Sequence, residues 1–134
     1  MTHRMRLTTP LDEHTEKLAT RIVGAAIEVH RHLGPGLLES VYESAMCVEL
    51  TAARIPFVRQ AHFDVTYRGE RVGDGRLDLL VDDRIIVELK AVDGLAPVHQ
   101  AQVISYLRAT GHRLGLLINF NVPVLKDGVR RVIL

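Results

Sequence analysis

The segment RIIVELKAV, residues 84–92, has the apolar composition of a buried β-strand but carries two charged side chains. Side chains alternate along a strand, so Glu88 and Lys90 point to one face while Val87 and Leu89 point to the other. Lys and Glu are rarely buried unless they are paired with each other or bound to something else. The segment therefore carries either a self-satisfied ion pair or part of a polar site.

Asp78 lies one short hairpin before Glu88. An antiparallel pairing that turns at residues 82–83 opposes residues whose numbers sum to roughly 165 or 166, which sets Asp78 beside Glu88. Two neighbouring carboxylates repel each other unless a proton or a cation lies between them. Their oxygens suit Mg²⁺ or Mn²⁺, and such a metal, together with Lys90, would polarise an attacking water and offset charge on a phosphate being cleaved. On the local pattern alone, a buried Glu88–Lys90 ion pair is an equally good interpretation.

Four further polar residues are candidates for the same site. Gln102 and Tyr106 are four residues apart on a predicted helix and share a face, and His99, three residues before Gln102, is placed to face the site as well. Glu39 lies at the edge of the buried face of another predicted helix. The alternatives are a Glu39 that stabilises a helix N-terminus, a Tyr106 that is an ordinary core aromatic, and a solvated or helix-terminal His99.

The elements that must position these residues follow from hydrophobic periodicity and turn signals. Residues 1–10 are predicted to be a flexible tail, and residues 11–134 a single domain. The order is two helices, three strands, a helix and two strands, which indicates an α/β fold with a mixed sheet flanked by helices on both sides. The predicted helices are 12–33, 37–54 and 98–111, and the predicted strands are 57–67, 72–81, 84–91, 113–120 and 129–134.

Composition excludes several classes of protein. The lone Cys47 among 134 residues rules out an internal disulfide, a cysteine-based zinc site and a cysteine-held iron–sulfur cluster within one chain. The N-terminal segment is too polar for a signal peptide, and no apolar run approaches the ~18 residues of a membrane span. We therefore expect an intracellular, cytoplasmic protein that does not enter a membrane.

The charges nearly cancel, with 17 Lys and Arg against 16 Asp and Glu, so no overall field attracts nucleic acid. Any attraction must then come from a local patch. The candidates are four arginines in the strands that lead into Asp78, with Arg108 as a weaker addition, and the alternative is that they are solvated strand and turn residues. The four are Arg59, Arg68, Arg71 and Arg76.

The segment GLLESVY, residues 36–42, is a Gly-x-x-Glu-x-x-Tyr motif. Together with Asp78, VELK (87–90) and QVISY (102–106), it resembles the PD-(D/E)XK nuclease superfamily, and specifically the small GxxExxY proteins. QVISY is similar to the Gln-x-x-x-Tyr motif of RecB-type nucleases. The likeness extends from about Ile22 to Val132. The chain departs from the pattern in having Leu in place of Pro before Asp78, and it lacks an iron–sulfur cluster, a helicase and a recognisable DNA-reading module.

The resemblance implies a restriction-endonuclease-like αβββαβ core with an extra N-terminal helix. It also implies that Asp78, Glu88 and the backbone carbonyl of Leu89 are ligands of Mg²⁺ or Mn²⁺, and that Lys90 orients or activates the water. Glu39 would complete the acidic site.

By the same resemblance, Gln102 and Tyr106 would contact the phosphate or support Lys90. The implied activity is that of a metal-dependent nuclease, which hydrolyses phosphodiester bonds. DNA is the first candidate substrate and RNA is the second. The alternative is a non-catalytic regulatory protein that keeps the fold and binds nucleic acid or protein, so enzymatic activity is left open. An intact set of mutually repelling acids favours the nuclease. We also expect a protein partner that supplies targeting, and a homodimer, because two sites related by a two-fold axis reach both strands of a duplex.

Overall fold

A computed structural model describes residues 10–134, so all of the predicted tail except Pro10 lies outside the described residues. None of the helices in the described part of the chain is long and apolar enough to cross a membrane. The elements are α1 (Glu13–Leu33), α2 (Glu39–Ala52), β1 (Phe57–Tyr67), β2 (Glu70–Val81), β3 (Ile85–Lys90), α3 (Pro97–Thr110), β4 (Leu114–Asn119), the short 3₁₀ helix η1 (Leu125–Gly128) and β5 (Val129–Ile133).

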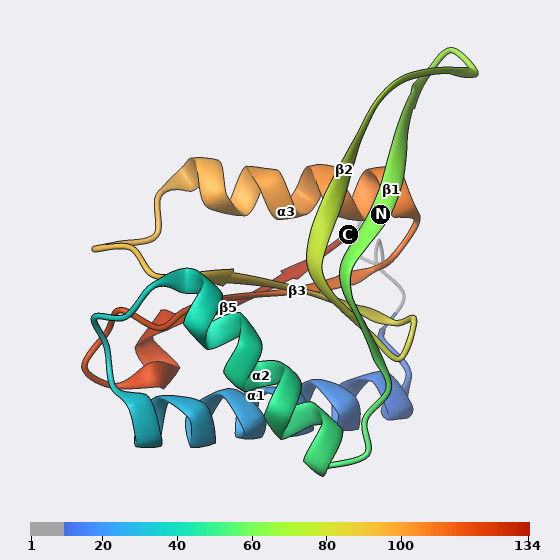
Figure 1. The fold of residues 1–134 in the computed structure, drawn as a ribbon. Helices are drawn as coiled ribbons and strands as arrows, with labels where there is room; N and C mark the ends of the chain where they lie inside the picture. The colour runs from blue at the N-terminus through green and yellow to red at the C-terminus, as the bar shows by residue number, and fades with distance from the viewer. Residues whose placement is uncertain (1–9) are drawn as a thin grey trace, which may run out of the picture.

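The strands form one mixed sheet in the order β1-β2-β3-β4-β5. All neighbours are antiparallel except β3 and β4, which are parallel and joined through α3. Helices α1 and α2 cover one face of the sheet and α3 covers the other (Figure 1). The predicted element order and the mixed sheet with helices on both sides are confirmed.

The predicted boundaries were wrong by one or two residues at several ends. Helix α2 begins at Glu39 rather than at residue 37, because Gly36 has a φ of 100° and Leu38 is still extended. Strand β2 begins at Glu70 rather than at residue 72, because the turn needs only Arg68 and Gly69, both with positive φ. Both differences arise from local turn geometry that hydrophobic periodicity does not report.

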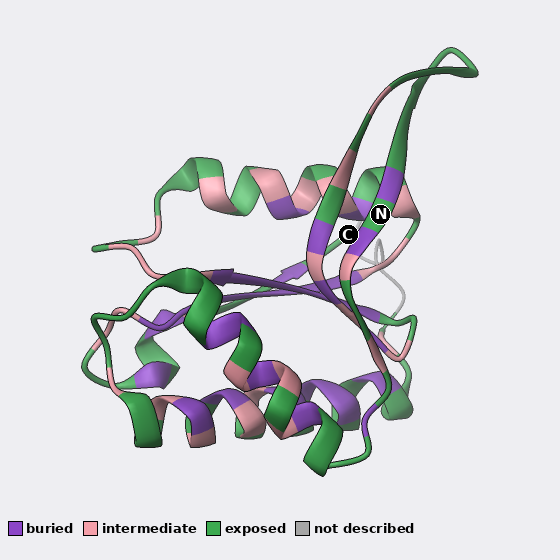
Figure 2. Ribbon diagram, in the orientation of Figure 1, coloured by how far each residue is buried: buried purple, intermediate pink, exposed green. Residues whose placement is uncertain are grey.

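The core lies on the two faces of β3 and β4, whose side chains are almost all buried (Figure 2). Leu89 and Ile118 face the α1–α2 side, and Ile86 and Leu117 face α3. Strands buried on both faces are continuously apolar, as is typical of parallel pairs in α/β proteins. The buried carboxylate of Glu88 therefore stands out against its surroundings.

Tyr42 fixes the position at which α2 begins. Its hydroxyl donates to the carbonyl of Gly34 at 2.6 Å and accepts the N–H of Leu37 at 3.1 Å. Its ring is fully buried and stacks on Phe120 with centroids 4.5 Å apart. The Tyr of the Gly-x-x-Glu-x-x-Tyr motif thus anchors the α1–α2 loop and, through it, the location of Glu39.

Strand β2 pairs with two neighbouring strands, and the two paired stretches differ in length. It pairs with β1 along almost the whole of Phe57–Tyr67, but with β3 only over Leu79–Val81. Beyond that point the β1–β2 hairpin leaves the sheet and extends past α3, and its outer end is exposed (Figures 1 and 2). The register shifts between Val65 and Thr66, opposite Gly73, so a bulge lies in the outer part of the hairpin.

A tight turn connects β2 to β3. Its two residues, Asp82 and Asp83, have φ values of 52° and 50°. Two consecutive positive φ values are typical of the hairpin turns whose twist matches that of the flanking strands. The turn sets the register between the two strands.

We predict that Tyr42→Phe lowers the free energy of unfolding by about 1–3 kcal/mol, because the partly buried Gly34 carbonyl and Leu37 N–H lose their partner while the ring still stacks on Phe120. Denaturant unfolding measures the change. The matched control is Tyr67→Phe, which removes the hydroxyl of a largely exposed tyrosine. Equal stability of the two variants would show that the hydroxyl of Tyr42 does not anchor the loop.

Candidate functional site

The candidate site lies at the fork where β2 separates from β3. The last paired residues are Leu79 and Val87, whose register is the one predicted from the hairpin, so Asp78 and Glu88 are the next residues along. The N–H of Asp78 donates to Oε2 of Glu88 at 2.8 Å, and the N–H of Leu89 donates to Oδ2 of Asp78 at 2.8 Å. Each carboxylate therefore takes up a backbone donor at the point where the ladder ends.

Both carboxylates are held in an environment that disfavours their charge. Glu88 is only 3% exposed. Its burial, followed by the charge of Asp78, raises the pKa of Glu88 to about 8, although the N–H of Asp78 and the charge of Lys90 act in the opposite direction. Burial also raises the pKa of Asp78, against the N–H of Leu89. The pair therefore favours a proton or a cation as a third component.

Lys90 shares a face of β3 with Glu88 and is half-buried. Within the described residues, its ammonium makes no ion pair at 4.0 Å or less, so the self-satisfied Glu88–Lys90 pair is not formed. Its charge still acts at longer range, lowering the pKa of Glu88, Asp78 and Glu39. Lys90 therefore belongs electrostatically to the site while its ammonium is left for another partner.

Helix α3 contributes the side of the site formed by Tyr106 and Gln102. Desolvation and the charges of Glu88 and Asp78 raise the pKa of the Tyr106 hydroxyl, and a side-chain hydrogen bond with Gln102 lowers it. The Tyr106 ring packs against Phe63 of β1 with centroids 5.1 Å apart. The predicted Gln102–Tyr106 face is therefore beside the two acids.

Helix α2 contributes Glu39 from the opposite side. The residue as a whole is exposed, but its carboxylate is partly desolvated, and this raises the pKa of Glu39. Asp78 acts in the same direction, while Lys90 and His99 lower it. Nδ1 of His99 accepts the N–H of Ala96 at 2.9 Å, so this ring also caps the start of α3. Glu39 and His99 both lie within electrostatic reach of the site.

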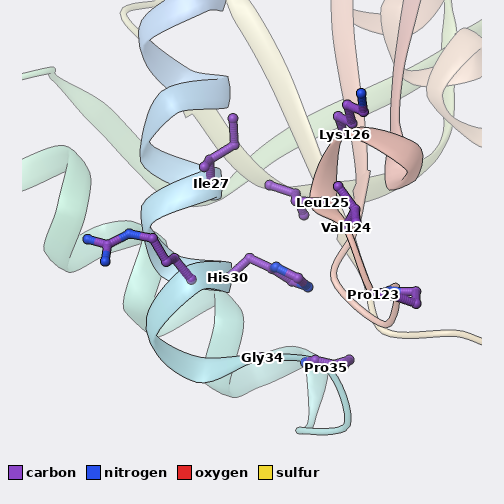
Figure 3. Close-up of a pocket in the computed structure, with 9 residues that line it drawn as sticks. Ile27, His30, Gly34, Pro35, Pro123, Val124, Leu125 and Lys126 are labelled. Carbon is purple, nitrogen blue, oxygen red and sulfur yellow. The ribbon is translucent and has the colours of Figure 1, made fainter.

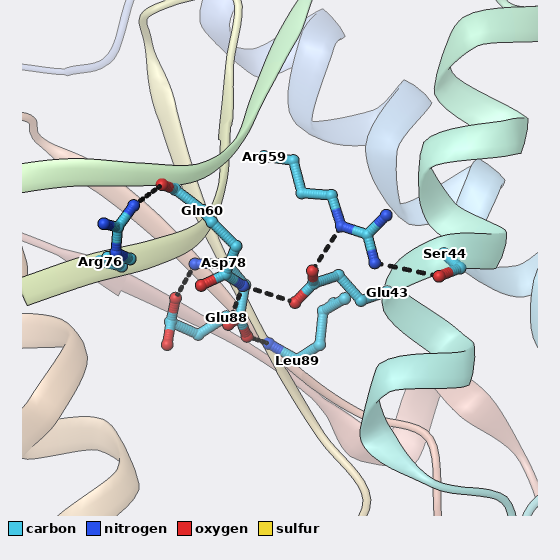
Figure 4. A network of polar contacts seen from close by, with 8 residues as sticks. All are labelled: Glu43, Ser44, Arg59, Gln60, Arg76, Asp78, Glu88 and Leu89. Carbon is cyan, nitrogen blue, oxygen red and sulfur yellow. Dashed lines mark hydrogen bonds and ion pairs between the residues drawn. The ribbon is translucent and has the colours of Figure 1, made fainter.

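A second acid on α2, Glu43, was missed by the sequence analysis. It is buried, at 8% exposure, and accepts from Arg59 Nε at 2.6 Å and from Gln60 Nε2 at 2.8 Å. Gln60 Nε2 also approaches Oδ1 of Asp78 at 3.5 Å. Figure 4 shows this network, with Glu43 reaching from α2 toward Asp78. The available signal was that Glu43 follows Glu39 by four residues, which places both on one helical face.

The four arginines of the predicted patch separate into two groups. Arg59 is bound to Glu43, and Arg76 Nη1 donates to the Gln60 carbonyl at 3.4 Å, so both lie near the fork (Figure 4). Arg68 lies over the Tyr67 ring at the hairpin turn, and Arg71 is paired with acidic side chains of the hairpin. Only the first group borders the acids, and Arg108 is an exposed residue of α3.

A hollow of about 510 Å³ lies elsewhere, between the end of α1 and the segment that precedes β5 (Figure 3). Its lining includes Ile27, Pro35 and Leu125 but no acidic residue. His30 uses Nε2 to bond the Val122 carbonyl at 2.7 Å, so this histidine joins α1 to the loop after β4. The hollow lacks the reactive groups that meet at the fork.

The fork offers a hard divalent cation only a small number of oxygen ligands. Within the described residues no group of three His, Cys, Asp or Glu side chains is arranged to hold a metal. Asp78 and Glu88 each have one oxygen fixed by a backbone N–H and one oxygen left. The N–H of Leu89 points toward β2, so its carbonyl points to the same side, whereas the Lys90 carbonyl is taken by the N–H of Phe120. Two carboxylates and one carbonyl are oxygen ligands that suit Mg²⁺ or Mn²⁺.

The family of the chain follows from comparison of its sequence with known proteins. Residues 16–132 match the model of the PD-(D/E)XK nuclease superfamily. Comparison with curated proteins and with solved structures gives no match. The matched residues run from α1 to β5 and include the whole fork, and the observed element order is that of the restriction-endonuclease-like fold with an additional N-terminal helix. The chain therefore belongs to the PD-(D/E)XK nuclease superfamily.

Proposed function

We propose that this protein is a Mg²⁺- or Mn²⁺-dependent nuclease that hydrolyses phosphodiester bonds. The observation that carries the proposal is the pair of neighbouring carboxylates, Asp78 and Glu88. Glu88 is buried and Asp78 is half-buried beside it, each carboxylate disfavours the charge of the other, and within the described residues Lys90 pairs with neither. The two backbone N–H groups that they bond need only an acceptor, and the amide oxygen of Asn or Gln would supply one without bringing two acids together.

The proposed ligands of the cation are Asp78, Glu88 and the Leu89 carbonyl, with Glu39 completing the acidic site directly or through water. When bound, the cation supplies Lewis acidity toward a water and a phosphate oxygen. Lys90 lies on the same face as Glu88. Its ammonium orients the attacking water and offsets charge on the phosphate.

The α3 side of the site serves the phosphate or Lys90. The Tyr106 hydroxyl lies near both acids, and Gln102 lies close enough to lower its pKa, so these two side chains present polar groups to the same place. His99 approaches the site from the start of α3, near Glu39. In this proposal Gln102, Tyr106 and Lys90 act together on one phosphate group of the substrate.

The proposed substrate is nucleic acid, and DNA is placed first because QVISY resembles the motif of RecB-type nucleases. The GxxExxY subfamily is the proposed closer affiliation, supported by the structural roles of Gly36 and Tyr42. Arg59 and Arg76 are the proposed phosphate contacts nearest the fork, and Arg68 and Arg71 are those on the hairpin.

The formal charge of +1 gives little general attraction to phosphate. We therefore propose that a protein partner supplies targeting.

We also propose that the protein acts as a homodimer, since a single small site cuts one strand. Sedimentation with and without duplex DNA measures the oligomeric state, and a monomer under both conditions contradicts the dimer.

The decisive experiment is cleavage of single-stranded DNA, duplex DNA and RNA by the pure protein with Mn²⁺. We expect cleavage of DNA that is lost in Glu88→Ala, because this change removes a ligand and half of the acid pair. The control is Glu49→Ala, which changes a glutamate of α2 outside the site. Absence of Mn²⁺-dependent cleavage of all three substrates, with no salt-sensitive binding, would favour the regulatory alternative.

Metal binding gives a second prediction. A cation must replace the proton that Glu88 holds below its pKa of about 8, so Mn²⁺ affinity should rise from about pH 6 to about pH 8. Isothermal titration of Mn²⁺ measures it, and Asp78→Asn should weaken binding at every pH. Equal affinity of this variant and the wild type would place the cation elsewhere.

A rise in pH should have the opposite effect on the stability of the metal-free protein, because Glu88 loses its proton. The pKa of Glu88 is higher in the folded state than its ordinary value of 4.5, so the folded state binds more protons between these values. The free energy of unfolding should therefore fall as pH rises from about 4.5 to about 8. This fall should be smaller in Glu88→Gln, and an unchanged slope in this variant would contradict the raised pKa.

A further prediction concerns Lys90. Lys90→Ala should abolish cleavage while Mn²⁺ affinity holds or increases, because a nearby positive charge opposes cation binding. Since no Glu88–Lys90 pair is formed, the loss of stability should stay below the roughly 3–5 kcal/mol that a broken buried ion pair costs. Lys126→Ala, at an exposed lysine, is the matched control. A large loss of stability with cleavage retained would assign Lys90 a structural role instead.

A further inference from the structure

Gln60 has a backbone conformation that its position in the fold does not explain. Its φ is 53°, in the left-handed region, although it lies inside strand β1. The other non-glycine residues with positive φ among residues 10–134 lie in turns or just after α2. A left-handed residue other than glycine costs roughly 1–2 kcal/mol and persists only where the surrounding structure imposes it.

The left-handed turn of the backbone changes the direction of the Gln60 side chain. In a regular strand, Arg59 and Gln60 would point to opposite faces of the sheet. Here both side chains bond the same carboxylate, that of Glu43, at 2.6 Å and 2.8 Å (Figure 4). The interruption in β1 is therefore what allows two consecutive residues to reach one acid on α2.

The Gln60 amide then connects α2 to the fork. Its Nε2 lies between Oε1 of Glu43 and Oδ1 of Asp78, at 2.8 Å and 3.5 Å. The other oxygen of Asp78 is already fixed by the N–H of Leu89. Gln60 is thus the neighbour that faces the remaining oxygen, the one left for a cation.

We propose that Gln60 is a positioning residue: Glu43 holds its amide, and this amide aims Oδ1 of Asp78 and keeps the helix that carries Glu39 beside β2. Arg59 supports the arrangement by neutralising Glu43 from the other side. The activity part of this inference rests on the proposed nuclease function, whereas the metal-binding part is independent of cleavage.

The test is Gln60→Asn. Asparagine accepts the left-handed backbone, but it is one methylene shorter and cannot span Glu43 and Asp78. We expect Mn²⁺ affinity by isothermal titration and kcat for cleavage each to fall by about 10–100-fold, as is usual when a residue that orients a metal ligand is lost. KM for nucleic acid should change little, because a positioning residue acts through Asp78 and not on the substrate itself.

Two further variants separate positioning from folding. Arg54→Asn introduces asparagine at another left-handed residue, outside the site and with a φ of 58°, and should leave Mn²⁺ affinity and kcat unchanged. In Glu43→Gln combined with Gln60→Asn, the losses should not multiply, because the two residues act as one unit. Multiplicative losses would overturn the role of Glu43 in holding Gln60.

The outcomes for the inference and for the proposed function are distinct. If the wild type cleaves and Gln60→Asn cleaves and binds Mn²⁺ equally well, the positioning role is wrong and the nuclease function stands. If the wild type does not cleave but Gln60→Asn binds Mn²⁺ more weakly than Arg54→Asn, the positioning role stands and the nuclease function falls. If the wild type neither cleaves nor binds Mn²⁺, both are wrong.

Discussion

The exchange of backbone hydrogen bonds for carboxylate bonds at the end of the β2–β3 ladder is the interaction on which the site depends. A strand that leaves its neighbour exposes N–H groups that need acceptors. Here the acceptors are Asp78 and Glu88, each of which bonds an N–H at 2.8 Å. The same two bonds close the end of the ladder, fix both carboxylates and bring their negative charges together. Hydrogen bonding at the end of the ladder therefore places two carboxylates side by side, an arrangement that a proton or a cation stabilises.

The elements around the fork supply their residues by different means. Strand β3 holds Glu88 and Lys90 rigidly because it is buried between two layers. Helix α3 brings Gln102 and Tyr106 as a helical pair, and α2 brings Glu39 through the anchored loop before it. The contributions from the helices depend on packing between distant segments, whereas the acid pair depends on one hairpin. The acid pair is therefore the best-determined part of the site.

This difference explains what the sequence could predict. Within the described residues, hydrophobic periodicity located the three α-helices and five strands but not the short 3₁₀ helix η1, and counting residues across a short turn placed Asp78 next to Glu88. Glu43 and Gln60 could not be located in this way, because their contact requires α2 to pack near β1 and the backbone at Gln60 to leave the strand conformation. The arginines show the converse limit. Arg71 looked available in the sequence, but it is paired with two acids of its own hairpin.

The turn at Asp82 and Asp83 has a consequence for how the chain can change over evolution. Because side chains alternate along a strand, one residue inserted or deleted between Asp78 and Glu88 would turn one of these acids to the opposite face of the sheet. This stretch can exchange residues but cannot change in length. The outer end of the β1–β2 hairpin lies beyond the fork and pairs only with itself, so it is free of that restriction. We therefore expect homologous chains to vary in hairpin length while keeping a fixed number of residues between the two acids.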